Sequence, residues 1–176
     1  MKMNMRSKPL IIMVGVSLSS ILAASGSAGE SFFFRYFPRS SSLSGCYARS
    51  YTPQHMALHP KQRVDTISLY HAPNQAGKPP TFIVSLSFTI ADKGFGALAD
   101  CEDRGSNASC TIEGGGGNFS LLPADENIKL VVGRRLKLPG VERVETNGER
   151  LANSPDLAIG GDDRVFLLMP IEEACG

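Results

Sequence analysis

The sequence predicts a small, mainly β domain, built as an antiparallel sandwich or a barrel-like meander with one short N-terminal helix and stapled by disulfide bonds. Three observations support this fold class. From about Arg63 onward, apolar and polar residues alternate with a period of two, which is typical of strands with one buried face. Glycine-rich and polar turn segments separate these stretches at short intervals. Four cysteines in one small exported domain favour disulfide formation.

The first 28 residues are predicted to be a cleavable signal peptide. A short basic region precedes an uncharged, apolar stretch over residues 9–24, and small residues lead to a cleavage position after Ala28. The stretch is shorter than the roughly 20 apolar residues that span a membrane, so we expect no transmembrane segment after cleavage. Cleavage removes three of the 18 basic residues and none of the 17 acidic residues, which changes the formal charge from +1 to −2. We therefore expect a periplasmic or secreted protein that binds no nucleic acid.

The four cysteines are predicted to form two disulfide bonds. Cys101 and Cys110 flank a polar run that looks like a hairpin loop, so a bridge between them is favoured, and it leaves Cys46 to pair with Cys175. All three connectivities stay open on sequence alone. The spacings fit no zinc motif. A lipid anchor at Cys46 is not expected, because its lipoprotein-like box lies well beyond the apolar stretch and lipidation would leave an odd number of cysteines.

Residues 29–44 are interpreted as a flexible lead-in, because the serine run and Pro38 favour no packed element. The aromatic side chains could instead dock on the domain or on a partner. Residues 45–176 are predicted to form a single β domain. Its helix is expected between Thr52, which can cap, and Pro60, which ends the run; Pro53 suits the first helical position.

The clearest strand is residues 81–90, where large apolar residues at 82, 84, 86, 88 and 90 share one face and hydroxyl side chains occupy most of the other. A hairpin turn is predicted at Gly133-Arg134, and turns or loops at 114–117 and 160–163. Residues 143–159 are expected to be a long surface loop. The other predicted strands are 64–71, 95–101, 109–113, 118–122, 127–132, 135–138 and 164–169.

Two segments resemble the start of a group of small exported bacterial proteins with no established activity: Gly45–Arg49 and, after it, His55–Pro60. The pair Cys101 and Cys110, the glycine run before Phe119 and the segment Gly161–Phe166 are similar too, so the likeness covers most of the chain after residue 28. It implies a bacterial, periplasmic setting, and it implies no activity, cofactor or site residue.

Few residues are candidates for chemistry. His55 and His59 lie four apart and would share a helix face, as two metal ligands would, but a third ligand such as His71 would be needed. Asp162-Asp163 is a weaker candidate for a hard cation or a turn cap. The basic cluster Arg134, Arg135 and Lys137 is either a solvated strand face or a contact for an acidic partner.

The sequence contains no catalytic constellation and no cofactor motif, so we expect a non-enzymatic binding module for an envelope protein or a small ligand. The alternatives are a metal-dependent or His-assisted hydrolase that uses His55 and His59, and a structural protein of the cell envelope.

Overall fold

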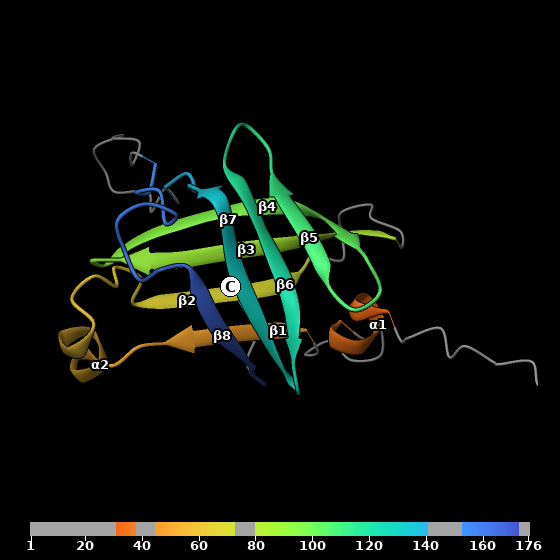
Figure 1. The fold of residues 1–176 in the computed structure, drawn as a ribbon, viewed down its shortest axis with the longest axis horizontal. Helices are drawn as coiled ribbons and strands as arrows, with labels where there is room; N and C mark the ends of the chain where they lie inside the picture. Colours follow the sequence, from red (N-terminus) through yellow and green to blue (C-terminus); the bar gives the residue numbers. More distant parts are fainter. Residues whose placement is uncertain (1–30, 38–44, 73–79, 141–152, 173–176) are drawn as a thin grey trace, which may run out of the picture.

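The chain folds into a closed, eight-stranded antiparallel barrel with only short helices in its described part (Figure 1). The computed structural model describes residues 31–37, 45–72, 80–140 and 153–172. Each strand pairs with its neighbours along the chain, and the last pairs back with the first. The helices are α1 (Phe32–Tyr36) and α2 (Pro53–Leu58), and the strands are β1 (Cys46–Ser50), β2 (Thr66–His71), β3 (Thr81–Ile90), β4 (Lys93–Asp103), β5 (Ala108–Ile112), β6 (Gly117–Ala124), β7 (Asn127–Leu136) and β8 (Val165–Pro170).

The predicted mainly β, antiparallel fold is confirmed, and of the two architectures the barrel is the one that forms. β3 spans the residues predicted for it, with Phe82, Val84, Leu86 and Phe88 buried. On its other face, the Ser87 hydroxyl lies 2.7 Å from that of Ser68, and an equivalent threonine pair continues the row. Cross-strand hydroxyl pairs of this kind help to set the register between neighbouring strands.

The core is one continuous hydrophobic cluster to which all eight strands contribute. An eight-stranded barrel is just wide enough for inward side chains to fill it. The largest fully buried side chains include phenylalanines from α1, β3, β6 and β8. Every buried side-chain nitrogen or oxygen atom among the described residues has a hydrogen-bond partner. The interior of the described barrel is therefore packed with apolar side chains.

The helix α2 forms where the sequence predicts it. The Thr52 hydroxyl accepts a hydrogen bond from the backbone N–H of His55 at 3.2 Å, and Pro53 occupies the first turn. The two helices lie at opposite ends of the barrel in Figure 1.

The hairpin predicted at Gly133-Arg134 is wrong, because both residues belong to the continuous strand β7. Gly133 does not adopt the positive φ that a glycine at the first position of such a turn requires. Instead it allows a close approach: a Cβ on Gly133 would lie 2.1 Å from Oδ1 of Asn118, beside a bulge in the β6–β7 ladder. The glycine is needed for strand packing and not for a turn.

The described part of the predicted lead-in, residues 31–37, packs on the barrel. Residues 32–36 form α1, and Phe32, Phe33, Tyr36 and Phe37 are buried in the core cluster. The alternative, in which these aromatic side chains dock on the domain, is therefore correct for residues 31–37. The rest of the lead-in and the predicted signal peptide lie outside the described residues.

Asp103, at the end of β4, holds α1 in place. Its Oδ2 accepts hydrogen bonds from the Ser31 hydroxyl and from the backbone N–H of Phe33, and its Oδ1 accepts one from the N–H of Gly105. The carboxylate thus supplies from a distant strand the contacts that an N-terminal cap supplies locally. Burial alone would raise the pKa of Asp103, but the hydrogen bonds from Ser31, Phe33, Gly105 and Phe32 outweigh it and hold the pKa below its ordinary value.

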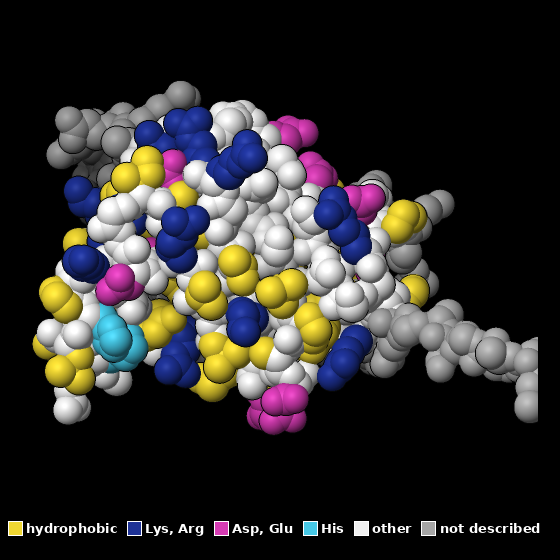
Figure 2. Space-filling view, viewed as in Figure 1, with side chains coloured by type: hydrophobic (Ala, Val, Ile, Leu, Met, Phe, Trp, Pro, Cys, Tyr) yellow, Lys and Arg dark blue, Asp and Glu magenta, His cyan; other side chains and the backbone are white. Residues whose placement is uncertain are grey.

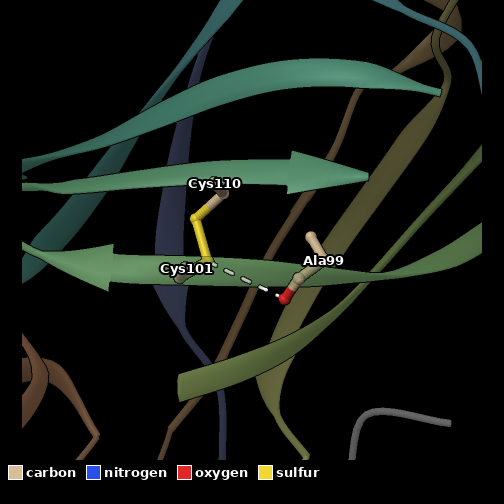
Figure 3. Close-up of a disulfide and its surroundings, with 3 residues drawn as sticks. All are labelled: Ala99, Cys101 and Cys110. Carbon is tan, nitrogen blue, oxygen red and sulfur yellow. Dashed lines mark hydrogen bonds between the residues drawn. A yellow bond between two sulfur atoms is a disulfide. The ribbon is translucent and has the colours of Figure 1, made fainter. Parts of the chain in front are cut away.

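Cys101 and Cys110 form a disulfide between the directly paired strands β4 and β5, as predicted (Figure 3). Both residues are buried, and the sulfur of Cys101 lies 4.0 Å from the carbonyl oxygen of Ala99. Cys46 is also disulfide-bonded. Cys175, its predicted partner, lies outside the described residues, so that pairing stays a prediction.

Among the described residues, no helix is both long and apolar enough to cross a membrane.

Candidate interaction surface

The outer face of β8 is apolar, although the side chains on its inner face already belong to the core. Phe166 and Leu168 are buried, whereas Val165, Leu167 and Met169 point outward with 53%, 43% and 41% of their surface exposed. A strand with one wet face normally places polar residues there. Three consecutive outward positions with large apolar side chains therefore need an explanation beyond the fold.

The neighbouring strands extend this apolar surface around one lysine. In the β6–β7–β8 ladders, Lys129 is paired directly with Leu122 on one side and with Leu167 on the other. One step along the barrel, Val131 is paired with Val165. Directly paired residues share a sheet face and lie within contact distance. We call the set Leu122, Lys129, Val131, Val165, Leu167 and Met169 the β7–β8 patch.

Figure 2 shows this side of the barrel, with β6, β7 and β8 in front as in Figure 1. Apolar side chains group over these strands, and basic side chains lie among and around them. The arrangement combines an apolar contact area with positive charge.

Arg49 borders the patch on the β1 side. Its Nη1 lies 3.7 Å from the sulfur of Met169, and its guanidinium lies 5.4 Å from the ring centre of Tyr51. The pKa of the Tyr51 hydroxyl is raised, chiefly by burial and also by the nearby charge of Asp163, although the charge of Arg49 partly offsets this rise. Arg164, which is exposed, directly precedes β8. The patch thus has positive charge at Lys129 in its centre and at Arg49 on its border, and Arg164 is next to it in the sequence.

The predicted basic cluster lies further along the same strand as Lys129. Arg134 and Arg135 are exposed at the end of β7, and Lys137 follows the strand half-buried, while Leu136 and Leu138 are buried as predicted. Arg135 already has an acidic neighbour, because its Nε lies 3.6 Å from Oδ2 of Asp156. The cluster is therefore a continuation of the basic side of β7, and Lys129 is the basic residue that apolar side chains surround.

The structure brings His55 and His59 together, but with their rings stacked. The ring centroids lie 4.4 Å apart with an interplanar angle of 26°, and Tyr51 stacks on the other side of His55. The Nε2 of His55 lies 3.0 Å from Oε1 of Gln62. Stacking places the rings face to face, whereas ligands of one metal ion point their nitrogens at a common centre.

No third ligand joins these two histidines in the described residues, which hold no group of three His, Cys, Asp or Glu side chains suited to a metal. His71 lies at the other end of the barrel, where its ring contacts those of Phe33 and Phe37. Burial there lowers the pKa of His71.

Asp163 is part of the scaffold, and it uses its carboxylate within the fold. Its side chain is fully buried and accepts hydrogen bonds from the backbone N–H groups of Arg63 and Val64. The Nε of Arg63 donates to Oδ2 at 2.8 Å. The Asp163 carboxylate therefore fixes the loop before β8 on the segment before β2, a contact between distant segments and not a local turn cap.

Comparisons with family models, with curated proteins and with solved structures give no match for this chain. The surface must therefore be interpreted from its own chemistry.

Sequence reasoning missed the β7–β8 patch. The signal was present in Val165–Met169, a run of five apolar residues where a half-exposed strand should alternate. Such a run indicates either a strand buried on both faces or one with an apolar outer face, and the barrel leaves β8 with the second.

Proposed function

We propose that this chain is an exported, non-enzymatic binding module that holds a protein partner on its β7–β8 patch. The observation that carries the proposal is the row of exposed Val165, Leu167 and Met169 on a strand whose other face is already packed in the core. Exposed apolar side chains grouped on one face mark interaction sites in soluble proteins.

The barrel limits how a partner can bind there. β7 is paired on both sides, and β8 is paired with β7 and, over a short ladder, with β1. We therefore expect a partner to dock on side chains and not to add a strand to the sheet. A rigid strand face loses little conformational entropy on binding, because its backbone is already ordered. Because one apolar cluster occupies the described barrel interior, a partner on the outer face is favoured over a small ligand inside.

Export to the periplasm is part of the proposal and rests on the pattern of residues 1–28. Mass spectrometry of the mature protein under non-reducing conditions tests it: we expect an N-terminus at Gly29 and no lipid on Cys46. A retained N-terminus at Met1 would contradict export by cleavage.

A photo-crosslinking residue introduced at Leu167 in living cells tests the binding function. We expect a discrete crosslinked product that disappears when Met169→Asp is added. The matched control is a crosslinker at Leu98, a similarly exposed residue (46%) on the outer face of β4. Equal products from both positions, or none from Leu167, would count against the patch as a binding site.

The alternative hydrolase lacks a supporting observation, because His55 and His59 stack on each other and His55 already contacts Gln62. A structural role in the envelope is likewise supported by no specific contact.

A further inference from the structure

Charged residues are distributed unevenly around the barrel, and the patch lies on its basic side. The four contiguous strands β6, β7, β8 and β1 carry Lys129, Arg134, Arg135 and Arg49 and no acidic residue. All acidic residues of the described strands lie on β4. The acidic residues nearest to the patch in sequence are Asp162 and Asp163 before β8, Asp125 and Glu126 in the turn that joins β6 to β7, and Glu172 beyond β8. Of these, Asp163 is buried and already paired with Arg63. The strand surface itself therefore attracts negative charge.

Lys129 sits where a partner would remove water from it. Leu122 and Leu167 flank it directly, so an apolar contact that covers both leucines also lies over the position of Lys129 and limits the access of water to its side chain. A buried ammonium without a counter-charge is unfavourable, whereas one paired with a carboxylate is tolerated. A partner that covers this surface is therefore expected to supply a carboxylate at that position.

A second copy of this chain does not fit this requirement. In a symmetric dimer whose two-fold axis passes through the centre of the patch, Lys129 would approach Lys129, and the surrounding strands offer no acidic residue to separate them. Like charges in apposition disfavour an interface by several kcal/mol.

A membrane surface is also a poorer match. Trp and Tyr side chains are enriched where proteins contact the membrane interface, and the patch contains neither. Its apolar side chains are Val, Leu and Met on regular strands.

We propose that the β7–β8 patch recognises a protein segment that presents one Asp or Glu side chain between apolar side chains, with the carboxylate paired to Lys129. The apolar side chains of the segment cover Leu122, Val165, Leu167 and Met169, and Arg49 and Arg164 attract the segment from the border. This inference rests on the proposed function and names the chemistry of its partner.

Selection from a random-peptide display library against the full-length chain, produced with its export signal, tests the inference. We expect enriched peptides with an Asp or Glu flanked by apolar residues. Their affinity should fall about tenfold or more in Lys129→Glu, should be lost in Leu167→Asp, and should decrease as salt is raised. The matched controls are Lys93→Glu, an exposed lysine at the start of β4, and Leu98→Asp. Both controls should bind like the unaltered chain.

The possible outcomes separate the inference from the function on which it rests. Enriched peptides without a carboxylate, bound through Leu167 and indifferent to Lys129→Glu, would overturn the inference and leave the binding function standing. A concentration-dependent dimer that Leu167→Asp disrupts would identify a second copy as the occupant and overturn it. Binding to vesicles that contain phosphatidylglycerol, with no enriched peptide, would overturn both, as would an unoccupied patch that gives neither peptides nor crosslinks.

Discussion

Asp103 shows how much of this fold depends on a single carboxylate. It joins α1 to the end of β4 through Ser31 and Phe33, which lie about 70 residues away in the chain, and it also accepts a hydrogen bond from the nearby Gly105. A partly buried acceptor of this kind is costly to replace, because several donors lose a charged partner at once. We therefore expect Asp103→Asn to lower the free energy of unfolding by about 1–3 kcal/mol at neutral pH.

The pH dependence of that effect follows from the lowered pKa of Asp103. A carboxyl whose pKa is depressed in the folded state stabilises the fold above its ordinary value of 3.8 and loses that contribution as pH falls through the lower folded value. The difference between the unaltered chain and Asp103→Asn should thus shrink in acid, as measured by urea unfolding across that range. Asp100→Asn, an exposed carboxylate on the same strand, is the control; a difference for Asp103→Asn that stays constant with pH would contradict the assignment.

The ion pair between the buried Asp163 and the partly exposed Arg63 makes a second prediction. Asp163→Ala removes a fully buried carboxylate that pairs with Nε of Arg63 and with two backbone N–H groups. We expect the free energy of unfolding to fall by about 1–3 kcal/mol, because the buried N–H of Val64 loses its acceptor. Asp162→Ala, at the exposed neighbouring position, should change the free energy of unfolding by less than about 0.5 kcal/mol. Equal effects of the two variants in denaturant titrations would refute the role of Asp163.

At the scale of elements, α1 closes one end of the barrel with aromatic side chains. Phe33 is 4% exposed and packs against the rings of Phe82 and His71, whereas its neighbour Phe34 is 45% exposed. Phe33→Ala should lower the free energy of unfolding by about 3–5 kcal/mol, because it leaves a cavity in the core. Phe34→Ala, the same substitution one position along, should cost less than about 1 kcal/mol. Similar losses of thermal stability in both variants would mean that α1 does not pack as described.

Strands with a clear alternating pattern could be predicted from sequence, and those without it could not. β3 was found residue for residue because its large apolar side chains occupy every second position. β1 escaped detection, since Cys46–Ser50 mixes polar and apolar residues without a clear period. Helix α1 was missed for a different reason: its order depends on Asp103, a partner that no local pattern reveals.

The candidate site was the least predictable element. Arg134, Arg135 and Lys137 were identified as a basic cluster from their proximity in sequence. Nothing in the local sequence singles out Lys129, because its apolar neighbours Leu122 and Leu167 come from different strands. Only the register of three strands brings these residues together, and register is a property of the assembled barrel.

For the whole molecule, the meander topology makes one strand pairing, here called the seam, different from all the others. Seven of the eight strand pairings join consecutive strands, and only the pairing of β1 with β8 joins the two ends of the barrel. That ladder is short, with Tyr47 opposite Pro170 and Ala48 opposite Met169, and it is followed by a hydrogen bond from the N–H of Ile171 to the carbonyl of Cys46. A short ladder between distant segments is expected to open first.

The predicted Cys46–Cys175 bridge would tie this seam, because Cys46 begins β1 and Cys175 follows β8 by five positions in the sequence. Replacing both cysteines with alanine should accelerate amide hydrogen exchange at residues 46–50 and 166–171. Because the bridge closes a long loop in the unfolded chain, its loss should also lower the free energy of unfolding by about 4–5 kcal/mol. Replacing Cys101 and Cys110 should instead cost about 2–3 kcal/mol and act first on the β4–β5 hairpin. Two results would contradict this role of the bridge: non-reducing peptide mapping that pairs Cys46 with another cysteine, or faster amide exchange at the same strands in both double variants.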